Sequence, residues 1–137
     1  MSWLLDTVTL SELRKDNRNP GVARWFDDHI DDALFVACVT FGEIERGIVR
    51  ARSSDPAFAM RLELWLNRVI VDFGDRALPF TTPVAIQWGR LSAQLNRFDA
   101  DLEIAATALV HNLTVVTRNV RHFEPTGVRV VNPWEAS

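Results

Sequence analysis

The sequence is poor in features that would cross-link the chain or anchor it in a membrane. It has a single cysteine, Cys38, which excludes an internal disulfide and a zinc site built from several cysteines. No apolar run reaches the roughly 18 residues that a membrane-spanning helix needs. The first residues lack the basic stretch and the long apolar core of a signal peptide. We therefore expect a cytoplasmic protein without a membrane segment.

Lysine is almost absent as well, and this bears on possible partners. Lys15 is the only lysine among 15 basic residues, and the others are arginines. Arginine suits bidentate phosphate contacts better than lysine does, although a genome-wide preference for arginine explains the same bias. The net charge of −3 argues mildly against binding nucleic acid by electrostatics alone. Composition therefore leaves nucleic-acid binding open.

What the sequence does contain is a regular alternation of strand-like and helix-like segments. The 137 residues show no repeat or linker, so we expect one domain over residues 1–137. Strands are expected at 3–5, 34–39, 77–78, 113–117 and 128–131. Expected helices are a turn through Leu10 and Leu13, a helix opened by Pro20, one from Thr40 to about Arg52, one opened by Asp55-Pro56, one opened by Thr82-Pro83, and one from Asp99 to His111. This alternation predicts an α/β fold, a three-layer α/β/α sandwich with a central, mainly parallel sheet.

Several acidic and polar residues fall where such a sheet binds ligands. Asp6 ends the first strand, Glu43 follows the second, Asp101 opens the helix before the fourth, and Thr117 and Asn119 follow the fourth. Ligands of open parallel sheets bind beyond the carboxyl ends of the strands. Hard cations such as Mg²⁺ take oxygen ligands, and clustered carboxylates without a cation repel one another. The positions therefore favour a divalent-metal site.

Each acid also has a purely structural interpretation. Thr40 and Glu43 have the spacing of a capping box, in which the glutamate serves the helix start and needs no metal. Asp99, Asp101 and Glu103 crowd one helix start, where negative charge is stabilised by the helix dipole. Asp99 suits the N-cap, and Glu103, two residues beyond Asp101, is expected to point elsewhere.

Ordered motifs over nearly the whole chain resemble a PIN domain, most closely the VapC-type toxins of bacterial toxin–antitoxin pairs. They are Leu4-Leu5-Asp6-Thr7 with Leu10-Ser11-Glu12-Leu13, Thr40-Phe41-Gly42-Glu43-Ile44, Asp101-Leu102-Glu103-Ile104-Ala105-Ala106-Thr107-Ala108, Thr117-Arg118-Asn119-Val120-Arg121-His122-Phe123, and Val131-Asn132-Pro133-Trp134. The resemblance implies an endoribonuclease dependent on Mg²⁺ or Mn²⁺, directed at transfer or ribosomal RNA. It also implies a VapB-type antitoxin that silences the enzyme, and a homodimer.

The same resemblance assigns roles to particular residues. It gives the metal-site roles to Asp6, Glu43 and Asp101. The fourth acidic position of PIN domains falls on Asn119, whose neutral amide removes one negative charge and puts a second metal in doubt. Val8 stands where relatives usually have Asn. Apart from the resemblance, Thr117 either makes a turn or contacts the RNA, and Arg46 and Arg118 either hold RNA phosphate near the site or only solvate their surface. The resemblance also implies hydrolysis that leaves a 5′-phosphate and a 3′-hydroxyl.

Two other functions fit part of the pattern. A receiver domain or a haloacid-dehalogenase-like phosphatase also has an Asp at the end of its first strand, but it needs a lysine late in the chain, and Lys15 lies early. A PIN-like module that binds a partner without catalysis remains open because of Asn119 and Val8. The three histidines show no metal-binding spacing and are expected to be structural or exposed, and Cys38 is expected in the core.

Overall fold

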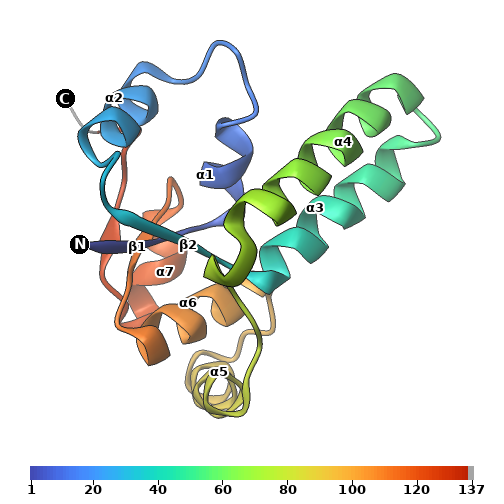
Figure 1. The fold of residues 1–137 in the computed structure, drawn as a ribbon. Coiled ribbons are helices and arrows are strands. Elements are labelled where there is room, and N and C mark those ends of the chain that lie inside the picture. Colours follow the sequence, from blue (N-terminus) through green and yellow to red (C-terminus); the bar gives the residue numbers. More distant parts are fainter. Residues whose placement is uncertain (136–137) are drawn as a thin grey trace.

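The centre of the fold is a five-stranded sheet in the order β3-β2-β1-β4-β5, with every pairing parallel (Figure 1). The computed structural model describes residues 1–135. The strands are β1 (Ser2–Leu5), β2 (Ala33–Ala37), β3 (Ala77–Leu78), β4 (Thr114–Val116) and β5 (Val130–Val131). The predicted α/β class with a parallel sheet is therefore confirmed.

Helices connect the strands and begin at residues that suit a helix start. They are α1 (Thr7–Glu12), α2 (Pro20–Asp28), α3 (Cys38–Ala51), α4 (Pro56–Phe73), α5 (Thr82–Leu95), α6 (Ala100–His111) and α7 (Val120–Phe123), with 3₁₀ turns at Gly74–Arg76 and Glu124–Thr126. The side chains of Asn19, Asp55 and Asp99 cap α2, α4 and α6. Within residues 1–135, no helix is long and apolar enough to cross a membrane.

The two faces of the sheet pack against different helices, and this gives the three layers. Trp3 and Leu5 of β1 point into a core that includes residues of α1, α2, α3 and α4. Leu4, between them, points to the opposite face, into a core with α5, α6 and α7. In Figure 1, α1 to α4 lie above the strands, and α5 and α6 lie below them. The alternation follows from the two-residue period of a strand.

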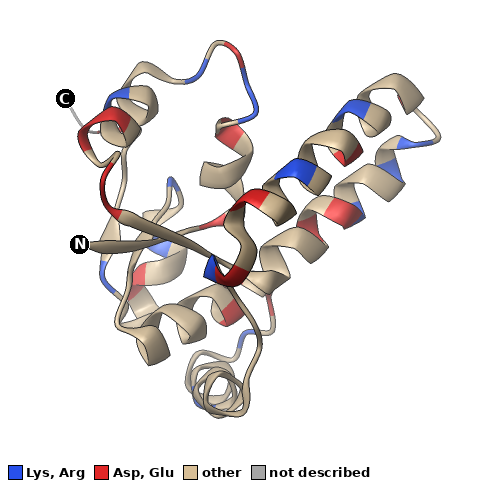
Figure 2. Cartoon of the chain, viewed as in Figure 1, with Lys and Arg blue, Asp and Glu red and all other residues tan. Residues whose placement is uncertain are grey.

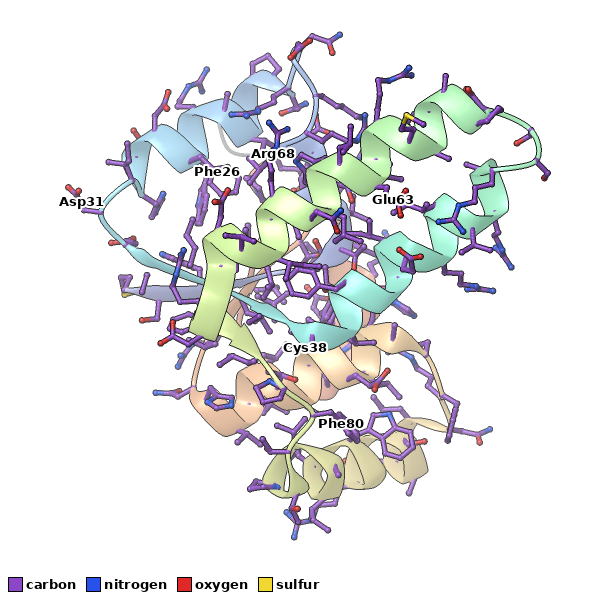
Figure 3. All side chains as sticks on the ribbon, turned by 45° about the vertical axis from the view of Figure 1, so that its right-hand side comes forward. Phe26, Asp31, Cys38, Glu63, Arg68 and Phe80 are labelled. Carbon is purple, nitrogen blue, oxygen red and sulfur yellow. The ribbon has the colours of Figure 1, made fainter. Side chains whose placement is uncertain are left out.

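The second strand is shorter than the sequence predicted. The apolar run 34–39 was expected to be one strand, but β2 ends at Ala37 and Cys38 already begins α3. Cys38 is exposed at this helix start (Figure 3) and is not a core residue. A short apolar run looks the same in a buried strand and in the first turn of a helix, so periodicity could not place the boundary.

The strand order reverses direction at the carboxyl ends of β1 and β4. From β1 the chain proceeds outward through β2 to β3, then returns to the other side of β1 to form β4 and β5. Connections after β1 and β4 therefore leave toward opposite faces of the sheet, and such a reversal point is where open α/β sheets bind ligands. Asp6 and Thr117 are the first residues beyond these two strands.

Candidate metal centre

Asp6 lies at this reversal point, directly after β1, and is held by two neighbours. Its Oδ1 accepts a hydrogen bond from the Thr9 backbone N–H (2.9 Å), which makes it the N-cap of α1. Its Oδ2 accepts from the Thr117 hydroxyl (2.6 Å), across the β1–β4 junction. Only 2% of Asp6 is exposed. Asp6 therefore caps α1 and is also fixed to the end of β4 through Thr117.

The surroundings of Asp6 disfavour its negative charge. Burial raises the pKa of Asp6, the hydrogen bonds from Thr117 and Thr9 act to lower that pKa, and the charge of Asp101 raises it further, so the net shift is upward. A carboxylate that is fixed in position but poorly solvated gains stability from a nearby cation. Asp6 therefore has the properties of a metal ligand.

Glu43 reaches the site from α3 and does not cap that helix. The N-cap of α3 is Ala37, and Thr40 lies buried inside the first turns. The predicted capping box is therefore wrong, because α3 begins two residues before Thr40. The Thr7 hydroxyl instead donates to Oε1 of Glu43, and the hydroxyls of Thr7 and Thr40 are hydrogen-bonded at 3.1 Å. The structural explanation that competed with a metal role for Glu43 is thereby removed.

Electrostatics place Glu43 close to the other two acids. Burial raises the pKa of Glu43, the Thr7 hydrogen bond lowers it, the charges of Asp101 and Asp6 raise it, and Arg46 lowers it, with a net upward shift. The three predicted ligands thus interact with one another through space, although they come from a strand end and two helices. Arg46 is exposed on α3 and near enough to Glu43 to influence its charge.

Asp101 lies in the first turn of α6, which follows the N-cap residue Asp99. Asp99 accepts from the Leu102 backbone N–H (3.3 Å), as expected for an N-cap. Asp101 is half-buried, and its Oδ2 lies 2.5 Å from Nδ1 of His122 on α7. The sequence did not indicate this contact, because the histidine spacing carried no ligand pattern.

Glu103 is a fourth acid near the site, contrary to the expectation that it points elsewhere. Burial raises the pKa of Glu103, and the negative charge of Glu43 raises it further. Helix α6 is buried on most of its surface, as Leu102, Ile104, Ala105, Ala106, Thr107 and Ala108 show. A helix packed on so many sides has little solvent-facing surface to which an acid could turn.

The loop after β4 carries three more predicted site residues, of which Thr117 is buried and Arg118 and Asn119 are exposed. Thr117 is fully buried, donates to Asp6 and accepts from the Asn119 backbone N–H (2.9 Å). Asn119 and Arg118 are exposed and line a polar hollow of about 380 Å³ with Arg121. The Arg118 guanidinium lies over the Trp134 ring, 5.7 Å from its centre. Among residues 1–135, the Asn119 side chain has no hydrogen bond to the acids.

The donor set of Asp6, Glu43 and Asp101 fits a hard divalent cation. All the ligand atoms are carboxylate oxygens, which Mg²⁺-type ions prefer. The pKa values of Asp6 and Glu43 are raised partly by mutual repulsion of the acids, which a cation would relieve. Within residues 1–135, the group of possible ligands whose donor atoms all lie within 4.8 Å of one another is a different one, formed by Asp99, Asp101 and His122. In that cluster Asp99 is already paired with Arg97, so the first set suits a cation better.

Comparison with known proteins gives one consistent picture. The family model of the PIN domain matches residues 3–127. The chain is 32% identical to a VapC ribonuclease of Sinorhizobium fredii over 139 residues, covering 96% of this chain and 97% of that protein. It is also 32% identical over 138 residues to the toxin FitB of Neisseria gonorrhoeae, covering 96% of this chain and 97% of that protein.

Solved structures agree with the sequence comparison over the full length. A structure of FitAB bound to a DNA fragment has a TM-score of 0.79 at 30% identity, covering 98% of this chain and 97% of that one. FitAcB from Neisseria gonorrhoeae has a TM-score of 0.76 at 29% identity, covering 97% of this chain and 99% of that one. The overall fold is therefore shared with proteins of similar sequence.

Proposed function

Because the chain belongs to the PIN-domain family, we propose that it is the toxin of a toxin–antitoxin pair, an endoribonuclease that hydrolyses RNA with a divalent cation, Mg²⁺ or Mn²⁺. The observation that carries the proposal is the buried hydrogen bond between Asp6 and Thr117 just beyond the carboxyl ends of β1 and β4. The charge of Asp101 contributes to the raised pKa values of both Asp6 and Glu43, which supports assigning all three acids to one site. Transfer or ribosomal RNA is the substrate class that we expect.

Each residue of the site has a defined part in this reaction. A bound divalent cation lowers the pKa of water and neutralises phosphate charge. Asp6, Glu43 and Asp101 would hold the cation, and the hydroxyls of Thr117 and Thr7 orient Asp6 and Glu43 respectively. Arg46 and Arg118 are exposed at the border of the site, where guanidinium groups can contact RNA phosphates. Asn119, exposed beside Arg118, is assigned to water or phosphate contact rather than to the acid cluster.

The non-catalytic alternative loses its two motivating residues in this arrangement. Val8 is 50% exposed, and Asp6 accepts its hydrogen bonds from Thr9 and Thr117 without a polar side chain at position 8. The hydrogen bonds to Asp6 and Asp101 come from Thr9, Thr117 and His122, so an asparagine at position 119 does not remove any of them. The catalytic function is therefore the better account of the site.

Purified protein incubated with RNA tests the proposal directly. We expect cleavage in Mg²⁺ or Mn²⁺ that EDTA stops, and no cleavage by Asp6→Ala. Asp75→Ala is the matched control, because Asp75 is an exposed acid in a 3₁₀ turn and should leave cleavage unchanged. Cleavage by Asp6→Ala at the wild-type rate would refute the site assignment. Products ending in a 2′,3′-cyclic phosphate would refute the expected hydrolysis to a 5′-phosphate and a 3′-hydroxyl.

A basic hollow beside α4 suits the antitoxin that we propose as partner. The hollow has a volume of about 760 Å³ and is lined by Arg14, Lys15, Asp16, Asn17, Arg61, Leu64, Trp65 and Arg68. Basic residues mark α4 and the loop after α1 in Figure 2, and Figure 3 shows Arg68 on α4. Arg14 and Arg61 both lie over the Phe58 ring, 5.3 Å and 5.9 Å from its centre. Cationic groups around aromatic surface suit an acidic, amphipathic segment.

The partner can be tested separately from catalysis. We expect a short protein encoded next to this chain to bind it and suppress its toxicity when both are produced in a bacterium. Arg61→Glu with Arg68→Glu should weaken that binding and leave RNA cleavage by the free protein unchanged. Unchanged binding by this double variant would place the antitoxin on another surface.

Exposed aromatic residues next to α5 are our proposed contact for a homodimer. Phe98 is 82% exposed and Phe80 is 48% exposed, and both pack edge-on against Trp88, with ring centres 4.9 Å and 6.1 Å away. Exposed apolar clusters of this kind mark association sites. Light scattering should give a dimer for the wild type and a monomer for Phe98→Asp; a monomeric wild type would refute the dimer.

A further inference from the structure

His122 contacts Asp101, which has fewer hydrogen-bond partners than Asp6. Its Nδ1 lies 2.5 Å from Oδ2 of Asp101. A carboxylate only accepts hydrogen bonds, so Nδ1 carries the hydrogen and donates it. Among residues 1–135 this is the only side-chain hydrogen bond that Asp101 makes. Asp6, in contrast, accepts from both Thr9 and Thr117.

The histidine is itself fixed by Arg97, which lies between α5 and α6. The Arg97 guanidinium donates through Nε and Nη2 to both oxygens of Asp99, at 2.9 Å and 3.0 Å. Its Nη1 donates to the backbone carbonyl of His122, at 2.7 Å. The Arg97 side chain is 19% exposed, so water competes little for these bonds. Arg97 therefore ties the N-cap of α6 to the helix that carries His122.

The same residues are poorly suited to a cation of their own. Asp99, Asp101 and His122 could offer three donor atoms. Both Asp99 oxygens, however, already accept from the guanidinium, and Oδ1 also accepts from the Leu102 backbone N–H. A fixed positive charge beside Asp99 repels a second cation. Asp99 and His122 therefore suit the support of Asp101 as a metal ligand better than they suit a metal site of their own.

We propose that His122, held by Arg97, is a positioning residue for Asp101, and this rests on the proposed function. The hydrogen bond occupies Oδ2 of Asp101 and leaves Oδ1 for the cation shared with Asp6 and Glu43. Partners that orient a metal ligand contribute roughly 10–100-fold to metal affinity or activity. A half-buried acid near the start of a helix has several rotamers open to it, so a single directed donor has a large effect on its orientation.

Two variants of similar polarity separate positioning from simple packing. In His122→Asn the side-chain amide can stand near the place of Nδ1 and still donate to Asp101. In His122→Gln the amide reaches the place of Nε2, on the far side of the ring, and the bond to Asp101 is lost. His111→Gln is the control, because His111 is exposed at the other end of α6.

The measurement is Mn²⁺ binding to the full chain by calorimetry, with RNA cleavage as a second readout. We expect His122→Asn to bind within about threefold of wild type and His122→Gln to bind roughly 10–100-fold more weakly, with His111→Gln unchanged. Equal affinity of the two His122 variants would overturn the positioning role. A wild type that bound no Mn²⁺ would refute the proposed function as well, whereas binding lost only in Asp6→Ala would leave that function intact and reject His122 alone.

Discussion

Asp6 and Asp101 belong to the same site but are held by different parts of the fold. We call Asp6, Thr9 and Thr117 the strand half, because they follow or contact the ends of β1 and β4. We call Glu43, Asp101 and Glu103 the helix half, because they project from α3 and α6. The strand half is buried and hydrogen-bonded to parts of the sheet. In the helix half, Glu43 depends on Thr7 and Asp101 on His122.

The strand half is the more firmly fixed part of the site. The Thr9 hydroxyl donates to the Val116 carbonyl (2.8 Å) and the Asp6 backbone N–H donates to the same carbonyl (3.1 Å), so α1 and β1 are both joined to the end of β4. Moving Asp6 requires moving the sheet. In the helix half, Glu43 and Asp101 are joined by hydrogen bonds to side chains of other helices, Thr7 and His122, and not to the sheet. Substitutions in the strand half should therefore have the larger consequences.

The largest effect is expected from Asp6→Asn, which removes a ligand and keeps the shape. Cleavage and Mn²⁺ affinity should fall by more than the roughly 10–100-fold typical of a supporting residue. Because burial raises the pKa of Asp6, the neutral amide should leave the metal-free protein at least as stable as the wild type. Chemical denaturation in EDTA measures this. A fall in the free energy of unfolding above about 1 kcal/mol would show that the charge itself stabilises the fold.

Thr117→Val should have the next largest effect, since it replaces a hydroxyl by a methyl group of similar size. The variant leaves Oδ2 of Asp6 without its donor, and we expect roughly 10–100-fold weaker Mn²⁺ binding. Thr117→Ser keeps the hydroxyl and should stay close to wild type. If Thr117→Val and Thr117→Ser bound Mn²⁺ with the same affinity, the Thr117 hydroxyl would have no part in orienting Asp6.

Thr7→Val is the corresponding change in the helix half and should have a smaller effect. Glu43 loses its hydroxyl donor but keeps the nearby positive charge of Arg46. We expect a loss of Mn²⁺ affinity at or below the lower end of the range for supporting residues, about tenfold, with Thr7→Ser unaffected. A greater loss of Mn²⁺ affinity than in Thr117→Val would show that the helix half is the more sensitive part of the site.

The smallest effect is a pH dependence of the metal-free protein. The folded state raises the pKa values of Asp6, Glu43 and Glu103, so it binds protons more tightly than the unfolded chain does. The free energy of unfolding should therefore fall as pH rises above the ordinary carboxyl range of about 4. Denaturation in EDTA from pH 5 to pH 8 measures the slope.

The same denaturation measurement, applied to variants, compares the strand half with the helix half. Asp6→Asn should flatten the pH dependence more than Glu103→Gln, because Asp6 is the more buried acid. Saturating Mn²⁺ should add about 2.7 kcal/mol at 100 times its Kd in the wild type, and should add nothing to Asp6→Asn. A wild-type stability that rose between pH 5 and pH 8 in EDTA would contradict the raised pKa values.

Local patterns were enough to predict the class of fold and the positions of most elements. Asn19-Pro20, Asp55-Pro56 and Asp99 each begin a helix in the structure, because side-chain capping and proline geometry act within a few residues. The same local logic failed for Thr40 and Glu43. Their spacing matched a capping box, yet the helix had already begun at Cys38.

Local sequence patterns are sufficient to predict the alternation of strands and helices, and from it that Asp6, Glu43, Asp101 and Thr117 lie near one edge of a parallel sheet. Which of these side chains touch one another depends on how the whole chain packs. Thr117 lies 111 residues from Asp6 and His122 lies 21 residues from Asp101, and no local pattern encodes such pairs. They meet because β4 adds to the sheet beside β1 and brings α7 against α6, and these are consequences of packing the whole chain.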